Sequence, residues 1–80
     1  MDKLEIERLK KSLHYLKSKQ RELKRHDENE IRSFESIIKY QKNFMLEQYK
    51  LLHYEPLIKQ EIKNTEIFIG NVQKIIDQYS

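Results

Sequence analysis

Apolar residues recur along this chain with the spacing of helices that pack side by side. In the first third they follow alternating steps of three and four residues, at Ile6, Leu9, Leu13, Leu16 and Leu23, with Gln20 taking one of the positions. This heptad spacing forms one narrow apolar stripe on an α-helix. It predicts a first helix over residues 3–26.

A wider stripe runs through the middle of the chain. Its heptad core positions are occupied by Phe34, Ile37, Gln41, Phe44, Gln48 and Leu51, and beside them lie Ile38, Met45 and Leu52. The first 55 residues contain no glycine or proline that would interrupt a helix. The pattern predicts a second helix over residues 28–53.

The same steps resume after Pro56, the single proline. They are occupied by Ile58, Ile62, Thr65, Ile69, Val72, Ile76 and Tyr79, and the stripe is widened by Phe68 and Ile75. Proline favours the first turn of a helix and keeps the residue before it, Glu55, out of helical conformation. We therefore expect a third helix over 56–79, joined to the second by a short connection. Gly70 is expected on its solvent side, with a kink at Gly70 as the alternative.

The boundary between the first two helices depends on charge. Lys24 and Arg25 suit a helix C-terminus, and Asp27 and Glu30 have the spacing of a capping box at a helix N-terminus. The heptad register continues through these residues, so one helix over 3–53 is the alternative. We favour a turn near residues 26–29, because adjacent carboxylates suit caps better than core positions.

The three elements predict an all-α fold in one domain, residues 1–80: a small antiparallel three-helix bundle, or a helical hairpin with coiled-coil-like packing. The second and third helices are expected to pair and to bury most of the core. The first helix has only a narrow stripe. We expect it to be loosely held, least protected against hydrogen exchange and available for homodimerisation.

Composition limits the chemistry. A chain of 80 residues that is 38% hydrophobic and 36% charged, without cysteine, forms a thin core with little room for a deep cleft. His14, His26 and His53 lack metal-ligand spacing, and no catalytic grouping or glycine-rich phosphate loop is present. We expect no enzyme activity, no metal or cofactor and no small-molecule ligand.

The location and source follow from the same composition. No apolar run exceeds three residues and no secretory signal is visible, so we expect a cytoplasmic protein that spans no membrane. Twelve lysines, four arginines and no alanine suggest AT-rich coding, as in a low-GC bacterium or one of its phages or plasmids.

Basic residues gather in the first helix. Residues 8–26 contain eight lysine or arginine side chains and one acidic side chain. Five of them form a basic stripe: Lys10, Lys11, Lys17, Lys24 and Arg25. Such a stripe is able to bind nucleic-acid phosphates, to dock on an acidic protein, or simply to be solvated.

Two other groups of residues are candidates for binding. Three glutamines at core positions set pairing specificity or lie at the edge in water: Gln20, Gln41 and Gln48. Several apolar residues point away from the stripes, and three of them would form an outer docking patch if they converge: Leu46, Tyr49 and Ile67. Tyr15 also points outward, and Tyr40 flanks the core face of the second helix.

The leading hypothesis is a small helical interaction protein, an adaptor, inhibitor or regulator that binds a protein partner and forms a homodimer. The first alternative is a nucleic-acid-binding module that uses the basic stripe. The second is a structural or scaffolding coiled coil.

Overall fold

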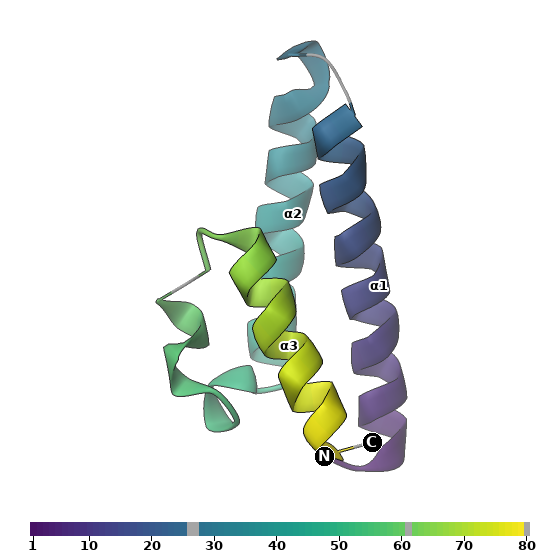
Figure 1. Ribbon diagram of the computed structural model, residues 1–80, viewed down its shortest axis with the longest axis vertical. Helices are drawn as coiled ribbons and strands as arrows, with labels where there is room; N and C mark the ends of the chain where they lie inside the picture. The colour runs from purple at the N-terminus through teal and green to yellow at the C-terminus, as the bar shows by residue number, and fades with distance from the viewer. Residues whose placement is uncertain (26–27, 61, 80) are drawn as a thin grey trace.

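Three α-helices and two short 3₁₀ helices make up the computed structural model, which describes residues 1–25, 28–60 and 62–79, the side chains of 28–31 excepted. The elements, in chain order, are α1 (Lys3–Arg25), α2 (Glu28–Gln48), η1 (Leu51–His53), η2 (Pro56–Lys59) and α3 (Thr65–Tyr79) (Figure 1). The predicted all-α helical bundle is confirmed.

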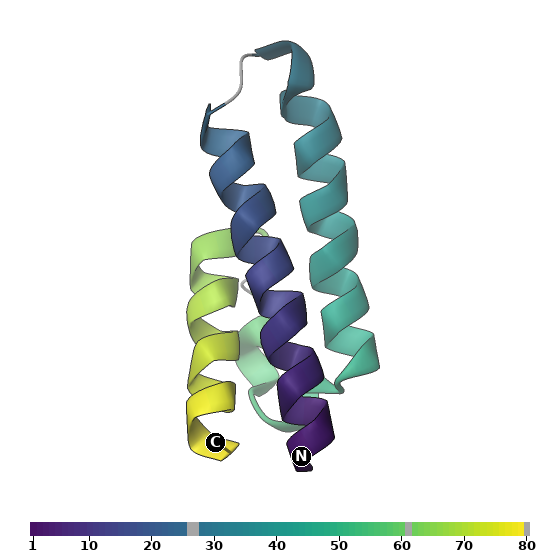
Figure 2. The ribbon, with the colours of Figure 1, turned by 90° about the vertical axis from the view of Figure 1, so that its right-hand side faces the viewer.

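The central helix is α1. It runs antiparallel to both α2 and α3, so those two helices run in the same direction (Figures 1 and 2). Helix α1 packs closely on α2 and on α3, whereas α2 and α3 have no comparable contact with each other. The predicted antiparallel pairing of the second and third helices is therefore wrong, because each of them packs on α1.

The narrow stripe of α1 is buried on both flanks. Four of its five apolar residues, Ile6, Leu9, Leu13 and Leu16, are at most 3% exposed, and Leu23 is half-buried, since α2 covers one side of the stripe and α3 the other. The expectation of a loosely held first helix is wrong for this reason. The stripe is also unavailable for homodimerisation while this fold is intact.

Helix α2 is turned about its axis relative to the predicted stripe. Its buried residues are Ile38, Lys42, Met45 and Leu46, followed by Tyr49 just after the helix. Ile37 and Phe44, predicted core residues, are exposed. The buried face is thus displaced by one residue, which is about 100° on a helix.

Residues beyond α2 explain this rotation. Leu51 and Ile58, from η1 and η2, are fully buried in one cluster with Leu46 and Tyr49. The segment between α2 and α3 thus folds against a side of α2 that a straight helical hairpin would leave in water.

Helix α2 ends at Gln48, five residues before the predicted end at 53. Lys50 adopts the left-handed conformation, with φ 51° and ψ 48°. A residue in this region terminates a helix, a position that glycine usually fills. At the other end, α1 (Lys3–Arg25) and α2 (Glu28–Gln48) run antiparallel to each other (Figures 1 and 2), so they are two helices and not one. The proposed capping box, Asp27 with Glu30, lies outside the described side chains.

Helix α3 begins at Thr65, not at Pro56. The Asn64 side-chain Oδ1 accepts a hydrogen bond from the Ile67 N–H at 3.3 Å, and the Asn64 main-chain carbonyl accepts one from the Phe68 N–H at 3.0 Å. Asparagine is among the best N-cap residues, which explains this start. Pro56 begins only the short η2, and Glu55 before it is extended, with φ −143°, as expected.

Gly70 lies on the exposed side of α3, with open space around the position of a Cβ and no positive φ. Alanine should therefore fit without strain. We expect Gly70→Ala to raise the free energy of unfolding by about 1 kcal/mol, because glycine is the poorer helix former. Chemical denaturation followed by circular dichroism measures the change. A loss of stability would instead indicate that α3 needs a bend at this residue.

Candidate functional site

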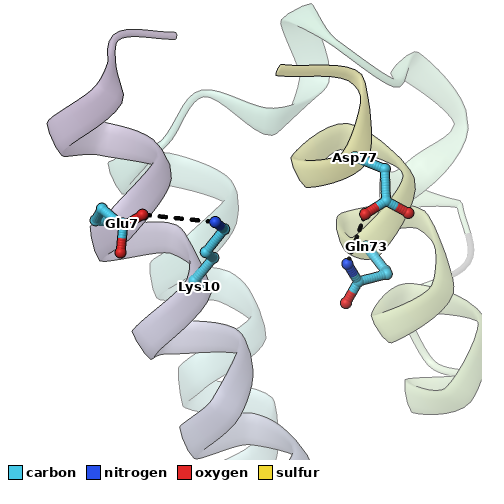
Figure 3. A network of polar contacts seen from close by, with 4 residues as sticks. All are labelled: Glu7, Lys10, Gln73 and Asp77. Carbon is cyan, nitrogen blue, oxygen red and sulfur yellow. Dashed lines mark hydrogen bonds and ion pairs between the residues drawn. The ribbon is translucent and has the colours of Figure 1, made fainter. Parts of the chain in front are cut away.

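The residues of the basic stripe lie in two environments, some beside α3 and the others on the exposed surface of α1. Lys24 and Lys17 lie against α3: the Lys24 Nζ is 2.6 Å from the Glu66 Oε1, and the Lys17 Nζ donates to the Gln73 Oε1 at 3.5 Å. Lys10 forms an ion pair with Glu7 of its own helix at 3.5 Å, as Figure 3 shows.

The two remaining residues of the stripe, Lys11 and Arg25, are exposed. On α3, Gln73 also donates to the Asp77 Oδ1 at 2.9 Å (Figure 3), so this edge of the bundle is a network of weak polar contacts between neighbouring side chains. The stripe therefore does not form one continuous free surface, because Lys17 and Lys24 contact side chains of α3.

The contact with Lys24 lowers the pKa of Glu66, through a hydrogen bond and through the lysine charge. Both side chains are exposed, so the pair contributes little to stability, and that contribution is lost as the pH falls through the lowered pKa. We expect Lys24→Gln to return the pKa of Glu66 to the ordinary glutamate range, measured by an NMR pH titration. Lys11→Gln, away from Glu66, is the control. An unchanged Glu66 pKa in Lys24→Gln would show that the two side chains do not meet in solution.

The three glutamines behave differently from one another. Gln41 is half-buried and donates to the Ser12 carbonyl at 3.3 Å, which ties α2 to α1. Gln20 is half-buried and lines a small hollow together with Glu66, and its Oε1 is buried without a partner among the described residues. Gln48 is exposed. Of the two predicted roles, Gln41 has the polar contact between helices, and Gln48 has the solvated position at the edge.

The predicted outer patch does not exist. Leu46 and Tyr49 are buried in the core, and only Ile67, on α3, is exposed. The rotation of α2 described above accounts for this, because it turns Leu46 and Tyr49 toward the core and turns Ile37 and Phe44, the predicted core residues, toward solvent.

The same rotation creates a different apolar surface. Four large side chains from α1 and α2 are 36–72% exposed: Tyr15, Ile37, Tyr40 and Phe44. Three of them line a shallow groove between the helices, which we name the α1–α2 groove. Its described lining residues are Lys11, Ser12, Tyr15, Ser36, Ile37, Tyr40 and Gln41.

Polar contacts between the helices form the floor of the α1–α2 groove. The Ser12 Oγ lies 2.9 Å from the Tyr49 hydroxyl, and the Ser12 carbonyl accepts the hydrogen bond from Gln41. Phe44 follows one turn further along α2, beyond the lining of the groove, and its ring meets that of Tyr49 edge to face with centroids 6.5 Å apart. Hydrogen bonds thus join α1 to α2 and to Tyr49 at the bottom of the groove, and the apolar side chains above them are exposed.

The charge at the α1–α2 groove is of one sign. Lys11 is the one ionised side chain among its described lining residues. At its edge the Lys19 Nζ lies 5.4 Å from the centre of the Tyr15 ring, a cation–π distance, and 3.3 Å from Glu22. The groove is therefore apolar, with two aromatic hydroxyls and the positive charge of Lys11 in its lining, and with the Lys19–Glu22 ion pair at its edge.

Sequence reasoning missed the α1–α2 groove because it placed Ile37 and Phe44 in the core and Tyr40 at the core edge. A signal was present: these three residues follow the i, i+3, i+7 spacing of a second apolar stripe on α2. Tyr15 was correctly expected to point outward and is exposed.

A second hollow lies between α1, α2 and the start of α3, and a buried lysine of α2 is among its lining residues. Lys42 is only 6% exposed, and its Nζ donates to the Ile62 carbonyl at 2.5 Å and to the Thr65 Oγ1 at 2.9 Å. Burial lowers the pKa of this ammonium group. Because both hydrogen bonds join α2 to the chain entering α3, Lys42 has a structural role.

In the described part of the chain, no three histidine, cysteine, aspartate or glutamate side chains are grouped so as to hold a metal ion. None of its helices combines the length and apolar character needed to cross a membrane. Comparisons with protein-family models, with curated proteins and with solved structures found no match to this chain.

Proposed function

We propose that this chain is a small, non-enzymatic protein-binding module of the cytoplasm, which docks a partner protein at the α1–α2 groove as an adaptor, inhibitor or regulator. The observation that carries the proposal is the gathering of Tyr15, Ile37, Tyr40 and Phe44 on one surface. Contiguous apolar surface on a small soluble domain marks interaction sites, and tyrosine and phenylalanine are enriched in interfaces.

The alternatives have less support. For nucleic-acid binding, the basic stripe would have to present its charges together, but Lys17 and Lys24 contact α3 and Lys10 pairs with Glu7. For a coiled-coil scaffold or a dimer formed through α1, the stripe of α1 would have to be free, but it is buried within the chain.

The test is an affinity capture from host extract with and without nuclease, using wild type and two variants. Ile37→Ala/Tyr40→Ala removes apolar side chains from the groove, and Ile67→Ala removes an exposed one from α3. We expect one protein to be retained after nuclease treatment by wild type and by Ile67→Ala, and recovery to fall at least about tenfold with the groove variant, as loss of interface anchors does.

Two outcomes would contradict the proposal. Recovery that disappears with nuclease would support the nucleic-acid alternative. Equal recovery by the groove variant and by wild type would show that any partner binds elsewhere. Circular dichroism of both variants shows whether the helices are intact.

A further inference from the structure

We infer that the segment docked at the α1–α2 groove is an amphipathic α-helix with acidic residues beside its apolar stripe. This inference rests on the proposed function and adds the chemistry of the partner. It follows from the shape of the groove, from the spacing of its apolar residues and from its charge.

The shape favours a helix as the occupant. The groove lies between two antiparallel helices, and its described lining includes no residue of α3. Helix α3 already covers another side of α1, which shows how a helix fits such a surface in this bundle. A helix laid in the groove would cover Ile37, Tyr40 and Phe44, which project from successive turns of α2 over roughly 10 Å.

The charge favours an acidic partner. Helix α1 carries nine basic and three acidic side chains, and Lys11 and Arg8 of this helix are exposed. Lys11 lines the groove and Lys19 lies at its edge, with no described acidic side chain in the lining. Because Lys19 is already paired with Glu22, carboxylates flanking the apolar stripe of a docked helix would meet the Lys11 ammonium group and the net positive charge of α1. Charge complementarity of this kind sets partner choice and association rate.

The same charge disfavours two other occupants. A second copy docked groove to groove would bring two Lys11 side chains into one interface, because a twofold interface uses the same residues from both chains. A nucleic acid needs several free cations along its backbone, whereas Lys19 is paired with Glu22. Ile37 and Phe44 offer apolar contact, which suits a helix face better than phosphates.

The test uses a displayed library of helical peptides that share one apolar stripe and vary randomly among Glu, Gln and Lys at the flanking positions. Selection on the wild-type chain should enrich Glu. In fluorescence anisotropy the all-Glu peptide should bind at least about tenfold more tightly than the all-Lys peptide, and added salt should reduce the difference. NMR shifts should map the all-Glu peptide to Ile37 and Phe44.

Charge-reversal variants sharpen the test. Lys11→Glu should abolish the preference for the all-Glu peptide, and Lys74→Glu, an exposed position on α3, should leave it unchanged. Enrichment of Lys, no flank preference, or an equal effect of both variants would overturn the inference.

The outcomes separate this inference from the proposed function. If capture from extract depends on Ile37 and Tyr40 but the library shows no acidic preference, the function stands and the inference fails. If a single-stranded oligonucleotide binds at the groove more tightly than either peptide, or if the chain dimerises through Ile37 and Tyr40 at micromolar concentration, the occupant is not a partner helix. If neither experiment depends on the groove, both proposals fail.

Discussion

Replacing Leu9 with alanine is expected to lower the free energy of unfolding by about 3 kcal/mol, a large part of what a domain of this size has. Leu9 is 0% exposed and belongs to the apolar cluster formed by α1, α2 and α3. Truncation there loses the transfer free energy of the side chain and leaves a cavity in the middle of the bundle. Urea denaturation followed by circular dichroism measures the loss.

The matched control is Leu4→Ala on the same helix. Leu4 is 59% exposed, so this variant should stay within about 0.5 kcal/mol of wild type. Equal costs for the two variants would contradict the central position of α1. Hydrogen exchange gives an independent check: the amides of Leu9, Leu13 and Leu16 should be among the slowest in the chain.

Replacing Lys42 with methionine is expected to cost about 2 kcal/mol, in the range of hydrogen bonds made by charged groups. Methionine keeps a buried apolar stem but leaves the Ile62 carbonyl and the Thr65 hydroxyl without the donor they share. Lys39→Met, an exposed position on the same helix, should be nearly neutral. If both variants have the stability of wild type, Lys42 does not hold the start of α3 in solution.

The pH dependence of the stability difference between wild type and Lys42→Met tests the burial of Lys42. Because its folded pKa is lowered from 10.5, the folded state binds fewer protons than the unfolded state between the lowered value and 10.5. The stability of wild type relative to Lys42→Met should therefore increase as the pH rises through this interval and level off above it. A constant or decreasing difference would show that Lys42 is solvated.

The stripe of α1 could be predicted from the sequence because its apolar residues leave one choice of face. Ile6, Leu9, Leu13 and Leu16 are all buried, as their spacing predicts. The spacing does not indicate how many helices cover the stripe. A narrow stripe is compatible with weak attachment and also, as here, with burial between two neighbours.

The orientation of α2 was beyond sequence reasoning because this helix has apolar residues around most of its circumference. Two faces compete, one with Ile37 and Phe44 and one with Ile38 and Met45. The second is buried, in one cluster with apolar residues of α1 and α3 and with Leu51 and Ile58 from the segment between α2 and α3. A contact between an irregular segment and a helix leaves no periodic signal.

The candidate site depends on this same choice of face. Once Ile37 and Phe44 are outside, Ile37 lines the α1–α2 groove with Tyr15 and Tyr40, Phe44 is exposed beyond it, and the patch expected at Leu46 and Tyr49 disappears. The start of α3 could have been predicted from the sequence, because Asn64 followed by Thr65 and Glu66 is a recognisable helix start. The apolar residues continue with helical spacing back to Ile58, and this continuation led to a predicted start at residue 56.

The central position of α1 also affects how the protein is made on the ribosome. The helix synthesised first is covered last on one flank, because Leu13 lies beside Ile76 of α3. At roughly 5–20 residues per second, the fifteen residues of α3 take about one to three seconds to synthesise. Until α3 has left the ribosome, the nascent chain presents the apolar side chains on that flank of α1 to chaperones and to other nascent chains.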